Sequence, residues 1–363
     1  MGFIKMSRAT KIIIVIVFAL SSAIQLCDKE INFNQTLQSD YFTHIKTFHI
    51  SEANPIFQTR PVDAVMDSLG NIYFTNFFDR TIKKSKPPFT SYEIIGRNGQ
   101  GPGEYIQPAY LVLKNNVLYF SDTSNNFIKS ILLNAANSRH RSFELSIRGG
   151  SSKFDVGDSL IAVFNKRPPH LSIYSYTPDN HTELIQEELQ FDDIYKPMQN
   201  LNGGGVQIDN SARIYVMPVA PYELNKYSTE NSASGARYFL SEESYFEHLP
   251  KYIKWDRKKY LQGLDASDDK RHEILNSFTK IYNFFIIQDT SNNFFIEILD
   301  RTHNIHQASH IFHLISQNGK LLATYELSDT SVLAVYKNMF YTYTLTNNDS
   351  KREVIIDLYK FEQ

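Results

Sequence analysis

The sequence predicts an all-β fold built from repeated four-stranded sheets, and three observations indicate it. Tyr (22) and Phe (26) are abundant while Gly and Pro are moderate, a bias that suits half-buried strands better than helices. The octet 67–74 aligns without a gap with the octet 209–216. Looser copies recur at a period of roughly 45 residues, which is the range of four-stranded propeller blades. Together these observations predict a six-bladed β-propeller.

The repeated unit begins with a short apolar strand, continues through a turn of Asp, Asn, Ser or Gly, and enters a strand with an aromatic centre. Some helical repeats have a similar period, but the alternating pattern and the turn residues favour strands. Two further strand-like runs follow each copy, as at 127–133 and 141–147, or 171–176 and 182–189. The six copies lie at 67–74, 113–120, 156–163, 209–216, 288–295 and 335–341.

The last unit ends one strand short, because only the runs 331–336, 339–345 and 353–361 follow its start. A spare strand, 41–50, precedes the first unit. If it completes the last blade, the two ends of the chain share one sheet and the ring is closed. We therefore expect one propeller domain over residues 28–363.

Residues 1–27 read as an export segment. A basic region containing Lys5, Arg8 and Lys11 precedes an unbroken apolar run at 12–20, and the small residues 21–23 follow. The apolar run is shorter than the roughly 20 residues that span a bilayer. The mature protein is thus expected to face an extracytoplasmic compartment.

Cys27 is the only cysteine, so an internal disulfide is excluded. A lone cysteine at this position resembles the acylated cysteine of bacterial lipoproteins. Ile24 suits the start of a lipobox, whereas Gln25 and Leu26 stand where small residues are usual. Lipidation at Cys27 and simple cleavage after Ala23 therefore both stay open.

Residues 241–280 interrupt the repeat between the fourth and fifth units and have helical spacing of Glu, Lys, Tyr and Leu. Ser241 is expected to cap a short helix that Pro250 interrupts, and Ser267 to start a second helix that ends near Phe278. Long insertions in compact repeat folds are often functional lids or rims. A basic run at 251–259 is interpreted as a solvated helix face, with an acidic glycan or anionic partner as the alternative.

A glycine-rich stretch follows the first unit and contains Gly99, Gly101, Pro102, Gly103 and Glu104. Glycine adopts positive φ without steric cost and proline fixes its own φ, so the stretch predicts an ordered turn. A phosphate-binding loop would open a helix, whereas this turn leads to another strand. We interpret it as the connector from the outer strand of the first blade to the inner strand of the second.

The run from Ile95 to Tyr105, with its GxGPGE motif, resembles the exported six-bladed β-propeller proteins of Bacteroidetes and related bacteria, relatives of the NHL-repeat propellers. The resemblance covers nearly all of the mature chain. Many members carry a cleaner lipobox than this chain does. The resemblance implies the fold but little chemistry, because most members have no assigned activity.

Four histidines, His303, His306, His310 and His313, have helical spacing, but the surrounding residues read better as strands, which would divide the four between two faces. No Glu of the His-Glu-x-x-His kind accompanies them. We expect sheet histidines that face solvent, not a metal site. No nucleophile elbow is present, so no catalytic residue is predicted.

In propellers the inner strand of each blade lines the central channel, and ligands bind where the connections enter those strands. This is an analogy from the fold class. It selects six candidate ligand-binding residues at the channel mouth: Arg60, Gln107, Asn200, Asn202, Lys280 and Tyr282.

The leading functional hypothesis is an exported, non-enzymatic monomer that binds a ligand, glycan, peptide or protein through the channel mouth and the insertion. No cofactor is predicted. The alternative is a hydrolase or lyase similar to the metal-dependent lactonase or amidating-lyase propellers, with calcium or zinc at the channel mouth. The formal net charge of −2 gives no reason to expect nucleic acid, and membrane attachment would depend on a lipid at Cys27. The expected location is periplasmic, outer-membrane or cell-surface.

Overall fold

The structure is a computed structural model, and residues 1–27, which include Cys27, lie outside the residues it describes. The described residues are 40–51, 61–76, 78–101, 104–133, 143–147, 152–166, 169–176, 182–190, 204–218, 224–232, 235–242, 258, 262, 267, 270, 274, 280–287, 292–300, 309–328, 330–348 and 351–362.

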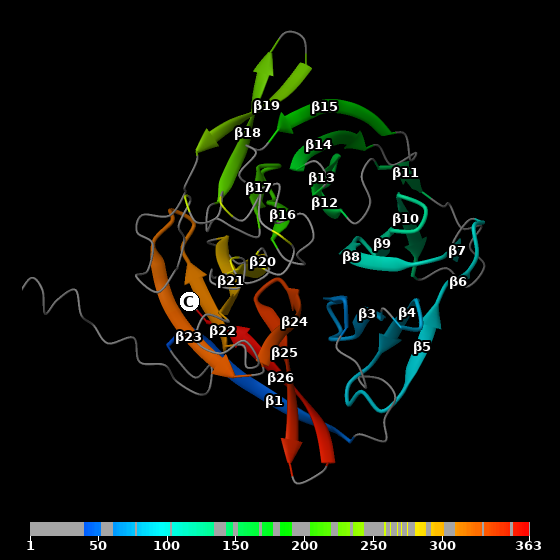
Figure 1. Ribbon diagram of the computed structural model, residues 1–363, viewed down its shortest axis with the longest axis vertical. Coiled ribbons are helices and arrows are strands. Elements are labelled where there is room, and N and C mark those ends of the chain that lie inside the picture. Colours follow the sequence, from blue (N-terminus) through cyan, green and yellow to red (C-terminus); the bar gives the residue numbers. More distant parts are fainter. Residues whose placement is uncertain are drawn as a thin grey trace, which may run out of the picture. The chain divides into compact units, whose positions relative to one another are not determined.

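Six antiparallel four-stranded sheets are arranged as a six-bladed β-propeller (Figure 1), which confirms the predicted fold. Blade 1 contains β2 (Asp63–Met66), β3 (Ile72–Asn76), β4 (Thr81–Ser85) and β5 (Tyr92–Ile95); blade 2 contains β8 (Pro108–Lys114), β9 (Val117–Asp122), β10 (Phe127–Leu132) and β11 (Glu144–Ser146); and blade 3 contains β12 (Lys153–Val156), β13 (Leu160–Lys166), β14 (Pro169–Tyr176) and β15 (Thr182–Gln190).

The second half of the ring repeats this order. Blade 4 contains β16 (Gly205–Ile208), β17 (Ile214–Met217), β18 (Asn225–Ser232) and β19 (Gly235–Glu242); blade 5 contains β20 (Lys280–Ile287), β21 (Asn293–Asp300), β22 (Ser309–Ile315) and β23 (Leu321–Ser328); and blade 6 contains β24 (Thr330–Tyr336), β25 (Met339–Asn348), β26 (Lys351–Phe361) and β1 (Phe42–Ser51).

The first strand of each blade lies innermost. These strands are β2, β8, β12, β16, β20 and β24, and each contacts the next around the full circle, including β24 against β2. Each pairs with one strand of its own sheet, and among the described strands none forms a ladder with its other edge. The channel is therefore surrounded by six strand edges, as expected.

Apolar clusters lie between neighbouring blades. One joins Ile72 and Phe74 of blade 1 to Ala334 and Ile356 of blade 6, and five similar clusters fill the other inter-blade spaces among the described residues. Side chains alternate along a strand between the two faces of a sheet, so each blade buries one face against each neighbour.

The aspartate of the repeated octet holds the turn between the first two strands of a blade. Asp67 Oδ1 accepts the N–H groups of Leu69 and Asn71 at 2.9 and 3.0 Å, and Tyr73 donates its hydroxyl to Oδ2 at 3.3 Å. Blade 4 repeats this arrangement, since Tyr215 donates to Asp209 Oδ2 at 3.3 Å. The repeat is therefore a structural unit in which the acidic residue satisfies turn amides.

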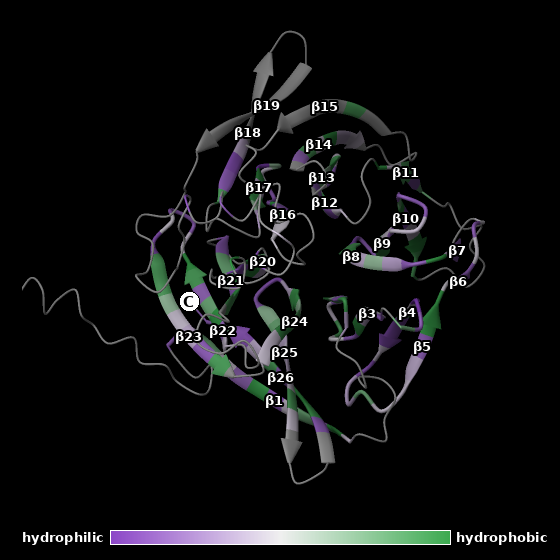
Figure 2. Ribbon diagram, in the orientation of Figure 1, coloured by the Kyte–Doolittle hydropathy of each residue, from purple (hydrophilic) through white to green (hydrophobic). Residues whose placement is uncertain are grey.

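The spare N-terminal strand completes the last blade. β1 pairs antiparallel with β26 from Phe42 opposite Phe361 to Ser51 opposite Glu353, with a bulge after His44. Figure 1 shows β1 in blue beside β26 in red, and Figure 2 shows polar and apolar residues mixed along β1. The Phe42 ring, 3% exposed, lies 5.2 to 5.7 Å from four other aromatic rings of blades 5 and 6. The predicted closure of the ring is confirmed.

The glycine-rich connector is a braced turn between β5 and β8. Arg97–Asn98 (β6) pairs in parallel with Glu104–Tyr105 (β7). The Glu104 carboxylate accepts the Gly101 N–H at 2.7 Å and lies 2.6 Å from the Arg97 guanidinium, and these contacts hold the pKa of Glu104 below its usual value. A Cβ on Gly99 would overlap that carboxylate. The stretch lies between the outer strand of blade 1 and the inner strand of blade 2, while Pro102 and Gly103 lie outside the described residues.

The insertion between blades 4 and 5 begins differently from the prediction. β19 runs through Ser241 to Glu242, so Ser241 continues a strand and does not cap a helix. The residues on either side of it, Leu240 and Glu242, pair with β18, and Ser241 lies at the bulge between them, so strand pairing overrides the intrinsic helix preference. Within the rest of the insertion, the described residues Lys258, Gln262, Lys270 and Ile274 are helical. In the part of the chain that the structure describes, no helix has the length and apolarity needed to cross a membrane.

Replacing Phe42 with alanine should destabilise the protein by about 3 to 5 kcal/mol, because a buried ring at the closing strand leaves a cavity. Ile45→Ala is the matched control, since Ile45 lies in the same strand and is 47% exposed; its effect should stay within about 0.5 kcal/mol. Urea unfolding followed by circular dichroism measures both. Equal stability of the two variants would show that β1 is not needed to close the ring.

Candidate functional site

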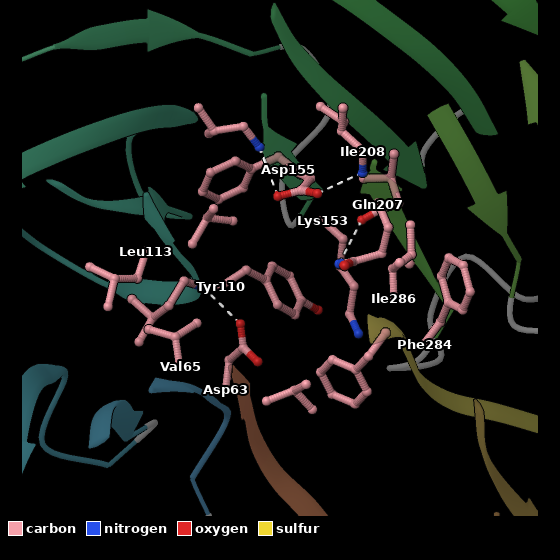
Figure 3. A pocket seen from close by; sticks show the side chains of 18 of the residues that line it. Asp63, Val65, Tyr110, Leu113, Lys153, Asp155, Gln207, Ile208, Phe284 and Ile286 are labelled. Atoms are coloured by element: carbon pink, nitrogen blue, oxygen red, sulfur yellow. Dashed lines mark hydrogen bonds between the residues drawn. The ribbon is translucent and has the colours of Figure 1, made fainter. Parts of the chain in front are cut away.

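A pocket of about 350 Å³ lies inside the channel and is lined by residues from the inner strands of all six blades. Figure 3 shows labelled side chains of blades 1 to 5 around this space. Every inner strand contributes to the lining, and the lining residues include Val65, Val112, Asp155, Gln207, Phe285 and Val335.

Two aspartates of the pocket bridge neighbouring blades through the free edges of the inner strands. Asp63 of β2 accepts the Leu111 N–H of β8 at 2.8 Å, and Asp155 of β12 accepts the Ile208 N–H of β16 at 2.7 Å (Figure 3). An N–H on a strand edge that faces a confined space needs such a partner. Both carboxylates therefore have a structural task at the pocket wall.

The same two carboxylates have raised pKa values. Burial raises the pKa of Asp63 to about 6, against the opposing effects of the Lys153 ammonium and the Leu111 N–H. Burial also raises the pKa of Asp155 to about 6, against the Ile208 and Val156 N–H groups and Lys114. Desolvation disfavours the charged form of a carboxyl group, and here it outweighs the nearby positive charges.

Three lysines line the pocket and come from three blades. Lys153 Nζ lies 5.5 Å from the centre of the Tyr110 ring, and Lys337 Nζ lies 5.5 Å from the centre of the Tyr336 ring. Lys114 Nζ lies 3.1 Å from the carboxylate of Asp158, whose side chain is 79% exposed. The pocket therefore combines ammonium groups, aromatic rings and amides in one space.

One pocket amide is held by a buried polar chain within blade 5. Asn283 Nδ2 donates to Glu297 Oε2 at 2.6 Å, and the other carboxylate oxygen lies 2.7 Å from His310 Nδ1. Glu297 is fully buried. Because a carboxylate only accepts hydrogen bonds, this contact fixes the orientation of the Asn283 amide and directs its oxygen away from Glu297.

Of the predicted channel-mouth residues that the structure describes, Tyr282 lines a smaller pocket that shares Asp63 and Asn283 with the channel pocket. Gln107 precedes β8, where its Oε1 accepts the Ser124 hydroxyl at 3.0 Å. Lys280 is buried at the start of β20, and the Tyr282 ring lies 5.9 Å from the His310 ring. None of the three is among the described residues that line the channel pocket. Their role in binding stays a prediction, and Arg60, Asn200 and Asn202 lie outside the described residues.

Two of the predicted surface histidines are buried, which corrects the expectation. His310 and His313 of β22 are 5% and 0% exposed, because β22 lies between β21 and β23 in a blade whose two faces pack against blades 4 and 6. Burial lowers the pKa of His313 to about 3, so this side chain is neutral at neutral pH. His303 and His306 lie outside the described residues. Across the described ranges, no group of three or more His, Cys, Asp or Glu side chains is placed to hold a metal ion.

The sequence reasoning missed Asp63, Asp155 and Lys153. Each stands in an inner strand just before one of the repeated turns, where the aligned position in other blades is often apolar or uncharged. A charged residue within a short, otherwise mostly apolar inner strand was therefore the feature of the sequence that could have identified them. Their contacts reach a neighbouring blade, 48 residues ahead for Asp63 and 53 for Asp155, so no local pattern reveals the partner.

The two raised pKa values predict a pH-dependent effect of Asp63→Asn and Asp155→Asn. A carboxyl group whose folded pKa exceeds its unfolded value stabilises the fold at low pH, and this contribution is lost as pH rises from about 4 through about 6. Asparagine keeps an oxygen for the N–H group but does not titrate. Each variant should therefore gain stability relative to wild type, on the order of 1 kcal/mol, between pH 4.5 and 7.5.

Urea unfolding at the two pH values measures this gain. Asp158→Asn is the control, because the Asp158 carboxylate is exposed and should give a difference from wild type that changes little with pH. A wild-type-to-variant difference that is constant with pH at positions 63 and 155 would contradict the assignment.

Comparisons with known proteins agree on the fold. No protein-family model matches the chain, and no curated protein matches it. Among solved structures, a candidate exported protein from Bacteroides fragilis is 9% identical with a TM-score of 0.52, covering 92% of this chain and 95% of that one. A candidate gluconolactonase is 10% identical with a TM-score of 0.50, covering 89% and 96%. These similarities support a six-bladed propeller and, at such identities, the fold alone.

Proposed function

We propose that this protein is an exported binding protein that holds a small polar ligand in the channel pocket and does not transform it. The observation that carries the proposal is the pocket of about 350 Å³ formed by all six inner strands. Ligand sites are typically concave, with apolar walls and a few polar groups at fixed positions. The aromatic rings, oriented amide and ammonium groups of this pocket match that description.

Hydrogen bonds within the pocket wall hold its side chains in fixed positions, which favours selective binding. Asp63 and Asp155 tie neighbouring blades together, and Glu297 holds Asn283 from behind. A wall whose side chains already have partners loses little conformational freedom when a ligand enters. The helical insertion and the predicted mouth residues are a second contact region in this proposal.

Binding in the pocket is tested by filling it. Gln207→Trp places a large ring at a lining position of β16, and it should abolish binding of the compounds that a small-molecule library screen detects by thermal shift. Gln317→Trp is the matched control, because Gln317 is exposed in the turn between β22 and β23; it should leave binding unchanged. Circular dichroism checks that both variants fold. Compounds that bind equally to both variants would place the ligand site elsewhere.

The absence of turnover is tested with the same compounds. Mass spectrometry of each compound after incubation with the protein should recover it unchanged. The metal-dependent hydrolase or lyase alternative predicts the opposite, namely conversion of a bound compound together with stoichiometric calcium or zinc in the purified protein. Either finding would replace the binding proposal with the enzymatic one.

Export is proposed from the basic and apolar segments of residues 1–27, and the similarity to a candidate exported protein of Bacteroides fragilis is consistent with it. If Cys27 is acylated, the wild-type protein should partition with membranes and Cys27→Ser should become soluble. Cell fractionation followed by immunoblotting measures this. Equal solubility of both proteins would favour simple cleavage after Ala23.

A further inference from the structure

Each lysine of the channel pocket either has an acidic neighbour or is exposed to solvent. Lys114 Nζ lies 3.1 Å from the Asp158 carboxylate. The positive charge of Lys153 acts on the Asp63 carboxyl group and lowers its pKa, against the larger effect of burial. Lys337 is exposed. The lysines therefore give no reason to expect an anionic ligand.

The aspartates of the pocket are engaged as well. Asp155 accepts the N–H groups of Val156 and Ile208 at 2.8 and 2.7 Å, and Asp63 accepts the Leu111 N–H at 2.8 Å. A cationic ligand would have to draw these carboxylates away from backbone N–H groups that need an acceptor. A charged ligand of either sign would leave water without gaining a free partner, which is unfavourable. The balance of charges therefore favours an uncharged ligand.

One uncharged group of the pocket, the Asn283 amide, has a fixed orientation. Its Nδ2 donates to Glu297 Oε2 at 2.6 Å, and the other oxygen of this fully buried carboxylate lies 2.7 Å from His310 Nδ1. The amide oxygen is thus directed away from Glu297, and among the described residues none donates a hydrogen bond to it. Asn283 lines both the channel pocket and the smaller pocket beside it. Its oxygen can accept a hydrogen bond from an O–H or N–H group of a ligand.

A second amide lies on the neighbouring inner strand. Gln207 of β16 lines the channel pocket, and β16 contacts β20, which carries Asn283. Gln207 Nε2 donates to the Val206 carbonyl at 3.1 Å, and its oxygen accepts no hydrogen bond from the residues that the structure describes. A hydroxyl group both donates and accepts, so it can pair with either end of an amide. The two amides together suit a ligand with several hydroxyl groups.

The size of the pocket and an aromatic ring define the rest of the ligand. Figure 3 shows the Tyr110 ring in the middle of the labelled side chains, where it offers an apolar surface. A volume of about 350 Å³ equals roughly a dozen water molecules at about 30 Å³ each, which corresponds to about a dozen non-hydrogen atoms. We propose that the pocket binds an uncharged, polyhydroxylated ring of monosaccharide size, with one hydroxyl group donating to the Asn283 oxygen. This inference rests on the proposed function, since it assumes that the pocket is the binding site.

The absence of charge is tested with rings of similar size. Isothermal titration calorimetry at pH 7 compares the uncharged D-glucose, D-galactose, D-mannose and myo-inositol with the charged D-glucuronate and D-glucosamine. At least one uncharged ring should bind, and both charged sugars should bind more weakly by about tenfold or more, because neither finds a free counter-charge. Binding of the uncharged ring should change little between about 50 and about 500 mM salt.

The role of Asn283 is tested with deoxy analogues of the tightest-binding ring. Removing the hydroxyl groups one at a time should identify one whose loss weakens binding to the wild-type protein by about tenfold. Asn283→Leu should weaken the parent ring by about the same factor, and this deoxy analogue should lose nothing further, because its acceptor is gone.

Gln207→Leu tests the same pocket from β16, and it should make the loss of a different hydroxyl group silent. It also keeps the test valid if Asn283→Leu does not fold. Gln317→Leu, in the exposed turn between β22 and β23, is the control and should bind like wild type.

Binding of either charged sugar as tightly as the best uncharged ring, or failure of all the uncharged rings to bind, would overturn the inference. So would deoxy effects that are the same in the wild-type protein and in both pocket variants. If the library screen finds compounds that Gln207→Trp excludes while no ring binds, the pocket remains the binding site and only the ligand class is wrong.

Discussion

Pairing of β1 with β26 is the interaction on which the rest of this structure depends. Blades 1 to 5 are each formed by consecutive strands, but blade 6 takes its outer strand from the other end of the chain. Without that strand, blade 6 would present β26 as a long open edge. The closed ring brings β24 against β2, and Tyr341 of blade 6 donates to the Gly70 carbonyl of blade 1 at 3.2 Å. Only in this closed state do all six inner strands surround one space.

In a closed ring of sheets, the strand edges without a ladder partner lie at the centre and face the channel. Each inner strand has an edge that no neighbour in its sheet covers. Two blades solve this with an aspartate that reaches across to the next strand, and Thr75 donates to the Ala109 carbonyl at 2.6 Å in a similar way. The groups that stabilise the channel wall are therefore also those that shape the pocket.

Much of this architecture could be read from local patterns. The octet beginning at Asp67 recurs at Asp209 because both aspartates must satisfy the same turn amides, and such chemistry leaves a signature in sequence. One spare strand precedes the first unit and the last unit lacks one strand. Counting strands along the sequence therefore predicted that the two ends pair and close the ring. The glycine-rich connector was recognisable because its glycines and Glu104 lie within one short turn.

The residues that form the pocket could not be predicted from local sequence patterns. Asp63 looks like any polar residue at the start of a strand until Leu111 of the next blade is placed beside it. His310 was expected at the surface, because periodicity indicates a strand but not what surrounds that strand. In the structure, β22 lies between β21 and β23, and His310 is buried beside Glu297. Ser241 had the features of a helix cap, yet pairing with β18 keeps it in a strand. Asp63 depends on a contact 48 residues away, whereas His310 and Ser241 depend on how neighbouring strands of one blade pair.

The most direct measurement of the central claim, that the closed ring creates one ligand site in its channel, is a crystal structure of the protein with its tightest-binding compound. We predict ligand density among the inner strands, within hydrogen-bonding distance of Lys153 or Asn283. Density on the outer surface of the blades, with the channel unchanged, would contradict it.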